Sequence, residues 1–290
     1  MAELTLIGTK GGPSLREVGP SFMPTSSYLA LGDLSIVIDC GLGVTAGLVR
    51  AGYSLTRLSH IFITHYHSDH YLELGALVHT AWTAGLAHKI HIYGPPGLDK
   101  IWDGFQSMMA FDIAVRISDE GRQPLDELVE LHIYDTSDDQ PFLLLDDGVM
   151  TVTGLVNKHP PIDKSFALRF THQGKTICFS GDTAYLPTLP AFAGNCDILV
   201  HEAMLSEGLD YILEKTKSVD DRLRTHLLQS HSFAGDAAHL AQMAGVSHLV
   251  LNHLIPPERH ICSDADWQAA VSAHFDGKLS VGFDGLKLTF

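Results

Sequence analysis

The sequence predicts an α/β protein in which two mixed β-sheets are covered by helices. Short apolar runs typical of strands alternate with helical stretches along the whole chain, and tight turns join some strands into hairpins. Hairpins join antiparallel strands, which argues against a single parallel sheet. No repeat, low-complexity segment or linker interrupts the 290 residues, so we expect one domain spanning residues 1–290.

The expected elements follow from apolar runs and the turn residues that end them. Strands are expected at residues 4–7, 28–31, 34–38, 61–64, 91–93, 128–134, 150–156, 166–171, 176–180, 198–200, 248–251 and 282–290. Apolar residues at helical spacing predict helices at residues 72–86, 98–116 and 232–244. Residues 117–127 are polar and rich in turn formers, which indicates a surface excursion.

Composition narrows the classes of protein. The chain is 45% hydrophobic, enough for a large core, and it carries a net charge of −15 without any basic run. Nucleic acid is therefore an unlikely partner. Four scattered cysteines without a CxxC pair indicate reduced thiols and a cytoplasmic protein. No secretion signal and no apolar run of membrane-spanning length is present, so no membrane association is expected.

Metal-binding side chains are concentrated directly after the expected strand 61–64. They are His65, His67, Asp69 and His70. Imidazole and carboxylate groups suit Zn²⁺, Mn²⁺ or Fe²⁺. In extended chain, His65 and His67 face the same way and can bind one ion. One short segment cannot complete two coordination shells, so further ligands must come from elsewhere.

Three later residues follow expected strands in the same manner. His159 follows strand 150–156, Asp182 follows strand 176–180, and His253 follows strand 248–251. A rigid strand end presents a side chain firmly to a cleft. A carboxylate that bridges two cations needs such a position.

The segment His-Tyr-His-Ser-Asp-His at residues 65–70 resembles the HxHxDH signature of the metallo-β-lactamase superfamily. The resemblance covers nearly the whole chain and implies a four-layer αβ/βα sandwich with two metal ions. It implies one metal on His65, His67 and His159, a second on Asp69, His70 and His253, and Asp182 between them. Two Zn²⁺ ions are expected, with Mn²⁺ or Fe²⁺ as alternatives. Flavo-diiron relatives carry Glu where this chain has His67, which favours hydrolysis over redox chemistry.

Later motifs resemble one branch of that superfamily. Ile-Leu-Val-His-Glu-Ala-Met at 198–204 and Gln-Ser-His-Ser at 229–232 are similar to segments of the arylsulfatase and ribonuclease Z-like branch, and residues 111–116 are similar to arylsulfatase-like members. This similarity implies that His231 contacts the substrate anion or protonates the leaving oxygen, and that Glu202 orients it. Asp69, His231 and Glu202 are the expected catalytic residues. Alternatively, His231 is an ordinary residue at the N-terminus of a helix.

The expected function is a dinuclear hydrolase of small sulfate or phosphate esters, in which a metal-bridged hydroxide attacks sulfur or phosphorus. Transfer-RNA processors of this branch commonly carry an RNA-grasping arm between the third ligand histidine and the bridging aspartate. Here residues 160–181 hold only a hairpin. Alternatives are a ribonuclease Z-like transfer-RNA 3′-endonuclease, a lactonase or other C–O hydrolase, and a metal-loaded sensor.

Some assignments stay open at the level of sequence. His201 either belongs to the site or packs inward. Gly11 and Gly12 either cradle an anion or form a plain turn, and Arg116 binds either substrate or a surface carboxylate. Residues 98–127 line a substrate pocket or belong to the core. The resemblance also leaves a homodimer open, although nothing in the sequence marks an interface.

Overall fold

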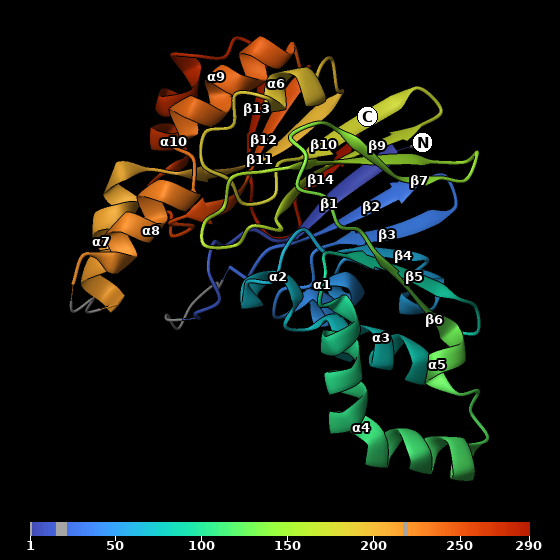
Figure 1. Ribbon diagram of the computed structural model, residues 1–290. Helices are drawn as coiled ribbons and strands as arrows, with labels where there is room; N and C mark the ends of the chain where they lie inside the picture. The colour runs from blue at the N-terminus through green and yellow to red at the C-terminus, as the bar shows by residue number, and fades with distance from the viewer. Residues whose placement is uncertain (1, 16–21, 217–219) are drawn as a thin grey trace.

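Two seven-stranded β-sheets lie face to face, and helices cover the outer face of each sheet (Figure 1). The computed structural model describes residues 2–15, 22–216 and 220–290. Both sheets contain parallel and antiparallel neighbours. The four layers confirm the predicted α/β class with two mixed sheets. Across the described segments, we find no helix with the length and apolar character that crossing a membrane requires.

The first sheet is built mainly from the N-terminal half of the chain. Its strands, in spatial order, are β14 (Lys287–Thr289), β1 (Ala2–Gly8), β2 (Ser26–Leu31), β3 (Leu34–Ile38), β4 (His60–Phe62), β5 (Ile90–Gly94) and β6 (Val129–Ile133). The helices of this half are α1 (Val44–Arg50), the 3-10 helix η1 (Leu55–Arg57), α2 (Ser68–Tyr71), α3 (Leu74–Thr83), α4 (Leu98–Glu120) and α5 (Leu125–Leu128). Strands β3 to β6 are parallel, with helical segments between them.

The second sheet is built from the C-terminal half. Its strands, in spatial order, are β13 (Lys278–Val281), β12 (His248–Ile255), β11 (Ile198–Met204), β10 (Lys175–Phe179), β9 (Phe166–His172), β8 (Thr151–Val156) and β7 (Phe142–Asp146). Its helices are α6 (Leu189–Phe192), α7 (Ser206–Thr216), α8 (Arg222–Ser230), α9 (Ala234–Ala244) and α10 (Asp264–Ser272). Strands β10 to β13 are parallel.

Apolar side chains fill the space between the two sheets. Phe62 of β4 meets Phe170 of β9 edge to face, with ring centroids 5.0 Å apart. Leu4 and Leu29 are fully buried in the same cluster. Two further apolar clusters lie under the helices on the outer faces. Close packing of this kind holds the strand ends, and with them the candidate site, in fixed positions.

The expected strands are present, but several have different ends. β11 and β12 continue past residues 198–200 and 248–251 as far as Met204 and Ile255. Polar residues such as Glu202 interrupt the apolar pattern there although they are buried. The single strand expected at 282–290 is wrong, because only its last part forms β14.

The excursion expected at residues 117–127 is also wrong in part. α4 continues to Glu120, and α5 follows after a short break. In the first turns of α4, Trp102 and Phe105 pack against the apolar cluster of the first sheet. Farther along α4, on the side turned away from this cluster, Met108 is 72% exposed and Phe111 is 84% exposed. Ile113, Ile117 and the buried Leu125 pack against the same cluster, so residues 98–127 combine core and surface positions along their length.

Candidate metal centre

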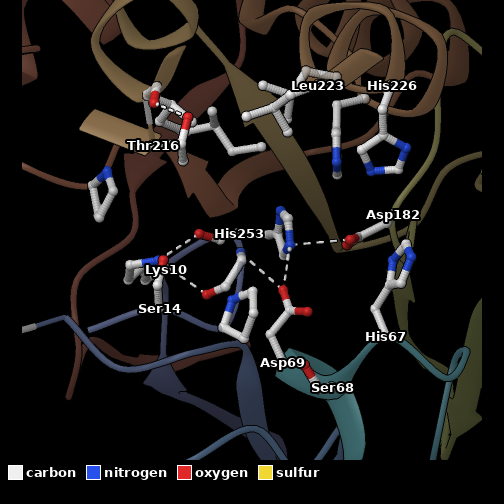
Figure 2. A pocket seen from close by; sticks show the side chains of 18 of the residues that line it. Lys10, Ser14, His67, Ser68, Asp69, Asp182, Thr216, Leu223, His226 and His253 are labelled. Carbon is white, nitrogen blue, oxygen red and sulfur yellow. Dashed lines mark hydrogen bonds and ion pairs between the residues drawn. The ribbon is translucent and has the colours of Figure 1, made fainter. Parts of the chain in front are cut away.

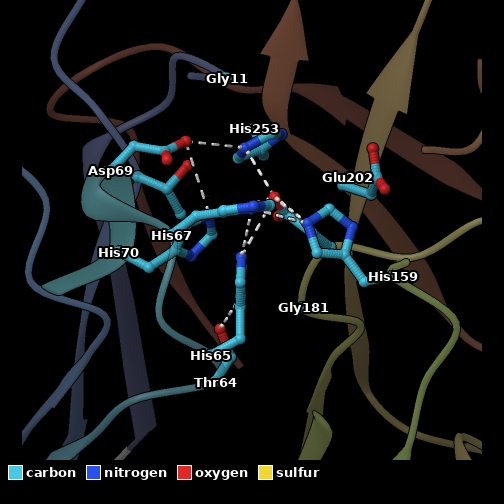
Figure 3. A network of polar contacts seen from close by, with 12 residues as sticks. Gly11, Thr64, His65, His67, Asp69, His70, His159, Gly181, Glu202 and His253 are labelled. Atoms are coloured by element: carbon cyan, nitrogen blue, oxygen red, sulfur yellow. Dashed lines mark hydrogen bonds and ion pairs between the residues drawn. The ribbon is translucent and has the colours of Figure 1, made fainter. Parts of the chain in front are cut away.

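Seven imidazole and carboxylate side chains from distant parts of the chain converge at one edge of the two sheets (Figure 3). The loop after β4 and the start of α2 carry His65, His67, Asp69 and His70. The loops after β8 and β10 carry His159 and Asp182, and β12 carries His253. All except His67 are buried. The structure thus brings together every residue that the sequence nominated as a metal ligand.

The first group consists of His65, His67, His159 and Asp182. His67 Nδ1 lies 3.2 Å from His65 Nε2 and 2.8 Å from His159 Nε2. Asp182 Oδ2 lies 3.8 Å from His65 Nε2 and 4.0 Å from His159 Nε2. His159 Nδ1 donates a hydrogen bond of 2.8 Å to the Ser230 carbonyl oxygen, so its Nε2 presents a lone pair to this group.

The second group consists of Asp69, His70, His253 and Asp182. Asp182 Oδ2 lies 3.1 Å from His70 Nε2 and 3.0 Å from His253 Nε2. Asp69 Oδ2 lies 3.3 Å from His253 Nε2 and 3.7 Å from His70 Nε2. The same oxygen of Asp182 therefore faces both groups.

The histidines of the first group are neutral. Burial lowers the pKa of His65 well below its usual value, lowers that of His67, and lowers that of His159 to about 3. Each ring therefore keeps a lone pair at pH 7, which is the form that binds a metal.

The second group is dominated by carboxylate charge. Burial disfavours the charged form of His253, but Asp182 and Asp69 outweigh it and raise its pKa to about 10. His70 is likewise opposed by burial, yet Asp182, Asp39 and Asp69 raise its pKa well above the usual value. This corner of the protein therefore strongly favours positive charge.

Asp39, directly after β3, supports the cluster from behind. Its Oδ1 accepts a hydrogen bond of 2.8 Å from the Thr64 amide, and its Oδ2 lies 2.8 Å from His70 Nδ1. A carboxylate in this position fixes the imidazole ring and directs the other ring nitrogen toward a metal. Asp39 was not expected at the site from the sequence, although it follows an apolar strand as His65 and Asp182 do.

The glycine turn before β2 approaches the second group closely. The Gly12 amide donates a hydrogen bond of 2.8 Å to Asp69 Oδ2. A Cβ atom at Gly11 would lie 2.9 Å from His253 Cε1 and 2.6 Å from Ile255 Cγ1. The turn therefore supports the candidate ligands, which favours the plain-turn interpretation over an anion cradle.

His253 reaches the cluster through an irregularity in β12. The parallel register pairs Glu202 with Asn252 and Ala203 with Leu254, so His253 is an extra residue in its strand. Its φ of 43° lies in the left-handed region, which is uncommon for a residue other than glycine. A bulge of this kind redirects one side chain without disturbing the strand on either side.

His231 and Glu202 form a pair beside the second group. His231 Nδ1 lies 3.1 Å from both carboxylate oxygens of Glu202, and the Thr183 amide donates a hydrogen bond of 2.7 Å to Glu202 Oε1. This arrangement leaves His231 Nε2 for the cavity. The His231 ring stacks on His253 with centroids 5.3 Å apart. His231 follows the last residue of α8, so its interpretation as an N-terminal helix residue is wrong.

The contacts of His201 and Arg116 settle two assignments that the sequence left open. His201 is fully buried and its Nδ1 donates a hydrogen bond of 2.6 Å to the Glu202 carbonyl oxygen, so it packs inside the sheet. Arg116 binds Asp112 and Glu120 on its own helix, at 2.8 and 3.0 Å, and is a surface ion-pair residue.

A cavity of about 240 Å³ opens onto the cluster (Figure 2). Its lining includes Lys10 and Ser14 from the N-terminal turn, but no residue of 98–127, so the pocket-lining interpretation of that segment is wrong. Opposite, α7 and α8 provide a largely apolar wall that includes Tyr211, Ile212, Leu223 and Leu227.

His226 is a cavity residue that was not nominated from the sequence. It projects from α8 toward the cluster (Figure 2), and its ring centroid lies 5.8 Å from that of His67. Its Nδ1 lies 3.3 Å from Ser230 Oγ. The helix that carries it was not predicted, so no pattern connected this histidine with the site.

The donor set fits a pair of metal ions. Ligands at about 2.0–2.1 Å from a tetrahedral ion lie roughly 3.3–3.4 Å from one another, close to most spacings in both groups. In addition, His65 Nε2 and His159 Nε2 both face His67 Nδ1, which can donate only one proton. Lone pairs that converge in this way need a cation between them.

Residues 20–216 match the family model of the Metallo-beta-lactamase superfamily. The chain belongs to this superfamily. With the two ligand groups, membership indicates a metal-dependent hydrolase with a dinuclear site. The chain is 30% identical to a Ribonuclease Z of Mycobacterium sp. strain KMS, over 98% of this chain and 94% of that protein. It is 28% identical to a Ribonuclease Z of Mycobacterium bovis strain BCG Pasteur, over 98% and 96%.

Solved structures support the same superfamily fold. The metallo-beta-lactamase fold protein YhfI from Bacillus subtilis gives a TM-score of 0.71 at 23% identity, with both chains fully covered. The short form of human tRNase Z gives 0.70 at 21% identity, covering 99% of this chain and 98% of that chain.

These relatives overturn two expectations about this chain. The expected small sulfate or phosphate ester substrate is wrong, and so is the expectation that nucleic acid is an unlikely partner, because relatives that match nearly the whole chain are named Ribonuclease Z. The net charge of −15 is a sum over the whole chain, whereas binding depends on the potential at the cavity. The β9–β10 hairpin does fill the stretch before Asp182, but that stretch alone does not decide whether RNA binds.

Proposed function

We propose that this chain is a ribonuclease Z-like transfer-RNA 3′-endonuclease, a metal-dependent hydrolase of an RNA phosphodiester bond. The observation that carries the proposal is the His231–Glu202 pair beside both ligand groups, in a chain that is 30% identical to a Ribonuclease Z over 98% of its length. A positioned imidazole next to metal ligands can protonate a poor leaving group, such as the ribose oxygen of RNA.

We propose Zn²⁺ as the native metal, because the ligand set is rich in imidazole and close to tetrahedral in spacing. His65, His67 and His159 would hold one ion, Asp69, His70 and His253 the other, and Asp182 would bind both. Bound in this way, the ions supply positive charge to the phosphate and lower the pKa of a water molecule.

The side chains around the ligands have separate tasks. Asp69, fixed by the Gly12 amide, would orient the attacking water as well as bind metal. Glu202, held by the Thr183 amide, would keep the His231 ring in one orientation. His231 would then hold a proton at Nε2 and deliver it to the departing oxygen.

The two sides of the cavity suit different parts of a nucleotide. The ligand cluster would take the phosphate, and the apolar wall of α7 and α8 would take the base or ribose. Lys10, which lines the opposite side, adds positive charge close to the phosphate position. His226 lies between the wall and the first ligand group, where it would contact the RNA near the bond that is cut.

The test measures cleavage of a precursor transfer RNA with a 3′ trailer by zinc-loaded protein, together with hydrolysis of bis(p-nitrophenyl) phosphate. Wild-type protein is expected to cut the RNA at one position. His231→Ala should slow RNA cleavage by about 10²–10⁴-fold but hardly affect the p-nitrophenyl substrate, whose leaving group needs no proton.

The matched control is His239→Ala, which removes an exposed histidine of α9. It should cleave both substrates at the wild-type rate. Rapid lactone hydrolysis without phosphodiester cleavage by the wild type would contradict the proposal. An equal loss on both substrates in His231→Ala would contradict the role of His231.

A further inference from the structure

A second group of potential metal ligands lies on β5 and β6 at the far edge of the first sheet. The parallel register sets His91 opposite Glu130 and Tyr93 opposite His132. Since Glu130 and His132 are two residues apart on one strand, their side chains share a face with His91. None of these residues lines the cavity of the metal centre described above.

The donor atoms of this group converge. His91 Nδ1 lies 3.0 Å from His132 Nε2. Glu130 Oε1 lies 3.7 Å from His132 Nε2, and Glu130 Oε2 lies 3.9 Å from His91 Nδ1. A tetrahedral ion with ligands at about 2.0–2.1 Å separates them by roughly 3.3–3.4 Å, which falls within this range of spacings. The Glu130 carboxylate faces both imidazoles, with Oε1 toward His132 and Oε2 toward His91.

Neighbouring rings and charges hold the three side chains in place. The His132 ring stacks on Tyr93 with centroids 4.3 Å apart and an angle of 10°. The His91 ring stacks on His60 at 5.4 Å and 25°. Lys89 Nζ donates a hydrogen bond of 3.1 Å to Glu130 Oε2, which leaves Oε1 as the ligand atom. Groups that are fixed in advance lose little entropy when they bind an ion.

The cluster is open to solvent and chemically ready to bind. The side chains of His91 and His132 are 32% exposed and that of Glu130 is 43% exposed, so an ion can reach them. Two imidazoles and one carboxylate form the three-ligand set of zinc sites that keep one open position.

We propose that His91, Glu130 and His132 bind a further divalent transition-metal ion, best suited to Zn²⁺, with water in the remaining position. The ion would fasten the edge strand β6 to β5, and so anchor the chain where it returns from α4 and α5. This proposal does not depend on the proposed endonuclease activity, because none of its ligands belongs to that site.

The test compares zinc content by mass spectrometry after dialysis at a fixed low concentration of free Zn²⁺. The double variant H91A/H132A should hold one equivalent of zinc less than the wild type and keep full activity on RNA or bis(p-nitrophenyl) phosphate. The control H239A/H260A removes two exposed histidines elsewhere and should hold as much zinc as the wild type. Equal zinc content in H91A/H132A and the wild type would overturn the proposal.

A milder variant covers the case in which the double variant does not fold. Glu130→Gln keeps the size of the side chain and should weaken zinc binding at this site by at least about tenfold, measured by competition with a chromogenic chelator. Zn²⁺ should also slow deuterium exchange in β6 of the wild type, and do so less in Glu130→Gln. An unchanged affinity in folded Glu130→Gln would overturn the proposal. A loss of phosphodiesterase activity without a change in zinc affinity at this cluster would concern only the metal centre described above.

Discussion

His248, at the start of β12, is a buried histidine outside the metal centre. Its Nε2 lies 2.9 Å from Ser280 Oγ, and the side chain is 7% exposed. Burial, with Lys278 nearby, lowers its pKa to about 4. In the unfolded chain the pKa is about 6.5, so between these values the unfolded state binds more protons. The stability that His248 contributes is therefore complete above pH 6.5 and is lost as the pH falls toward 4.

We predict a difference in pH dependence between the wild type and His248→Gln. Between pH 7.5 and pH 4.5, the wild-type free energy of unfolding should fall by about 2–3 kcal/mol more than that of the variant. Urea unfolding at both pH values measures this, with metal-free samples of each protein so that metal release does not contribute. Parallel pH dependence of the two proteins would show that His248 is not held neutral by the fold.

Among single residues, the candidate ligands were recognisable in the sequence for a local reason. His65, His159 and Asp182 each follow an apolar strand, and the structure brings them to one point. Asp39 obeys the same rule but lies outside the motifs that carried the resemblance. His226 obeys no such rule, because its position depends on how α8 packs over the cavity, which is a tertiary effect.

At the level of single elements, α10 begins with a reciprocal side-chain cap, although this helix was not predicted from the sequence. Ser263 Oγ accepts a hydrogen bond from the Asp266 amide, and Asp266 Oδ2 accepts one of 2.8 Å from the Ser263 amide. This reciprocal cap satisfies two backbone donors that the helix leaves free. It places Trp267, a fully buried side chain, against the second sheet's outer core.

Ser263→Ala should therefore lower the free energy of unfolding by about 1 kcal/mol. The matched control is Ser272→Ala at the other end of α10, where the hydroxyl bonds only within the helix and the side chain is exposed. That change should be nearly neutral. Denaturant unfolding of both variants gives the comparison, and equal effects at both ends would contradict a capping role for Ser263.

Elements were predictable where one local pattern dominates. The β2–β3 and β9–β10 hairpins are marked by glycine turns between apolar runs, and both are present. α7 and α8 were not predicted, because their sequences are mainly polar and each buries only a few residues. β7 was missed because it is an edge strand whose residues are only partly buried. In these elements tertiary packing, not local preference, decides the conformation.

For the whole molecule, the metal centre joins two halves of the chain. The first sheet carries the ligands up to His70, and the second sheet carries His159, Asp182 and His253. The two halves also share the apolar layer between the sheets. We propose on this basis that residues 1–290 act as one domain.

Removing metal should consequently destabilise the entire fold. An ion present at about 100 times its dissociation constant adds roughly 2.7 kcal/mol, so chelation should lower the melting temperature by about 5–10 °C. In Asp182→Asn, which removes the carboxylate that faces both groups, the same treatment should cause a much smaller shift. Calorimetry with and without chelator measures both proteins. A shift of the same size in the variant would place the stabilising ions elsewhere.

The extra residue in β12 has a consequence for anyone who engineers this scaffold. A left-handed histidine in a buried strand is a local strain of about 1–3 kcal/mol, and glycine at position 253 would relieve it. A library screened for heat resistance in the presence of a chelator, where no bound ion contributes stability, would thus reward loss of the imidazole. Selection for heat resistance in this protein therefore needs an activity assay in every round, because it would otherwise enrich stable variants that have lost activity.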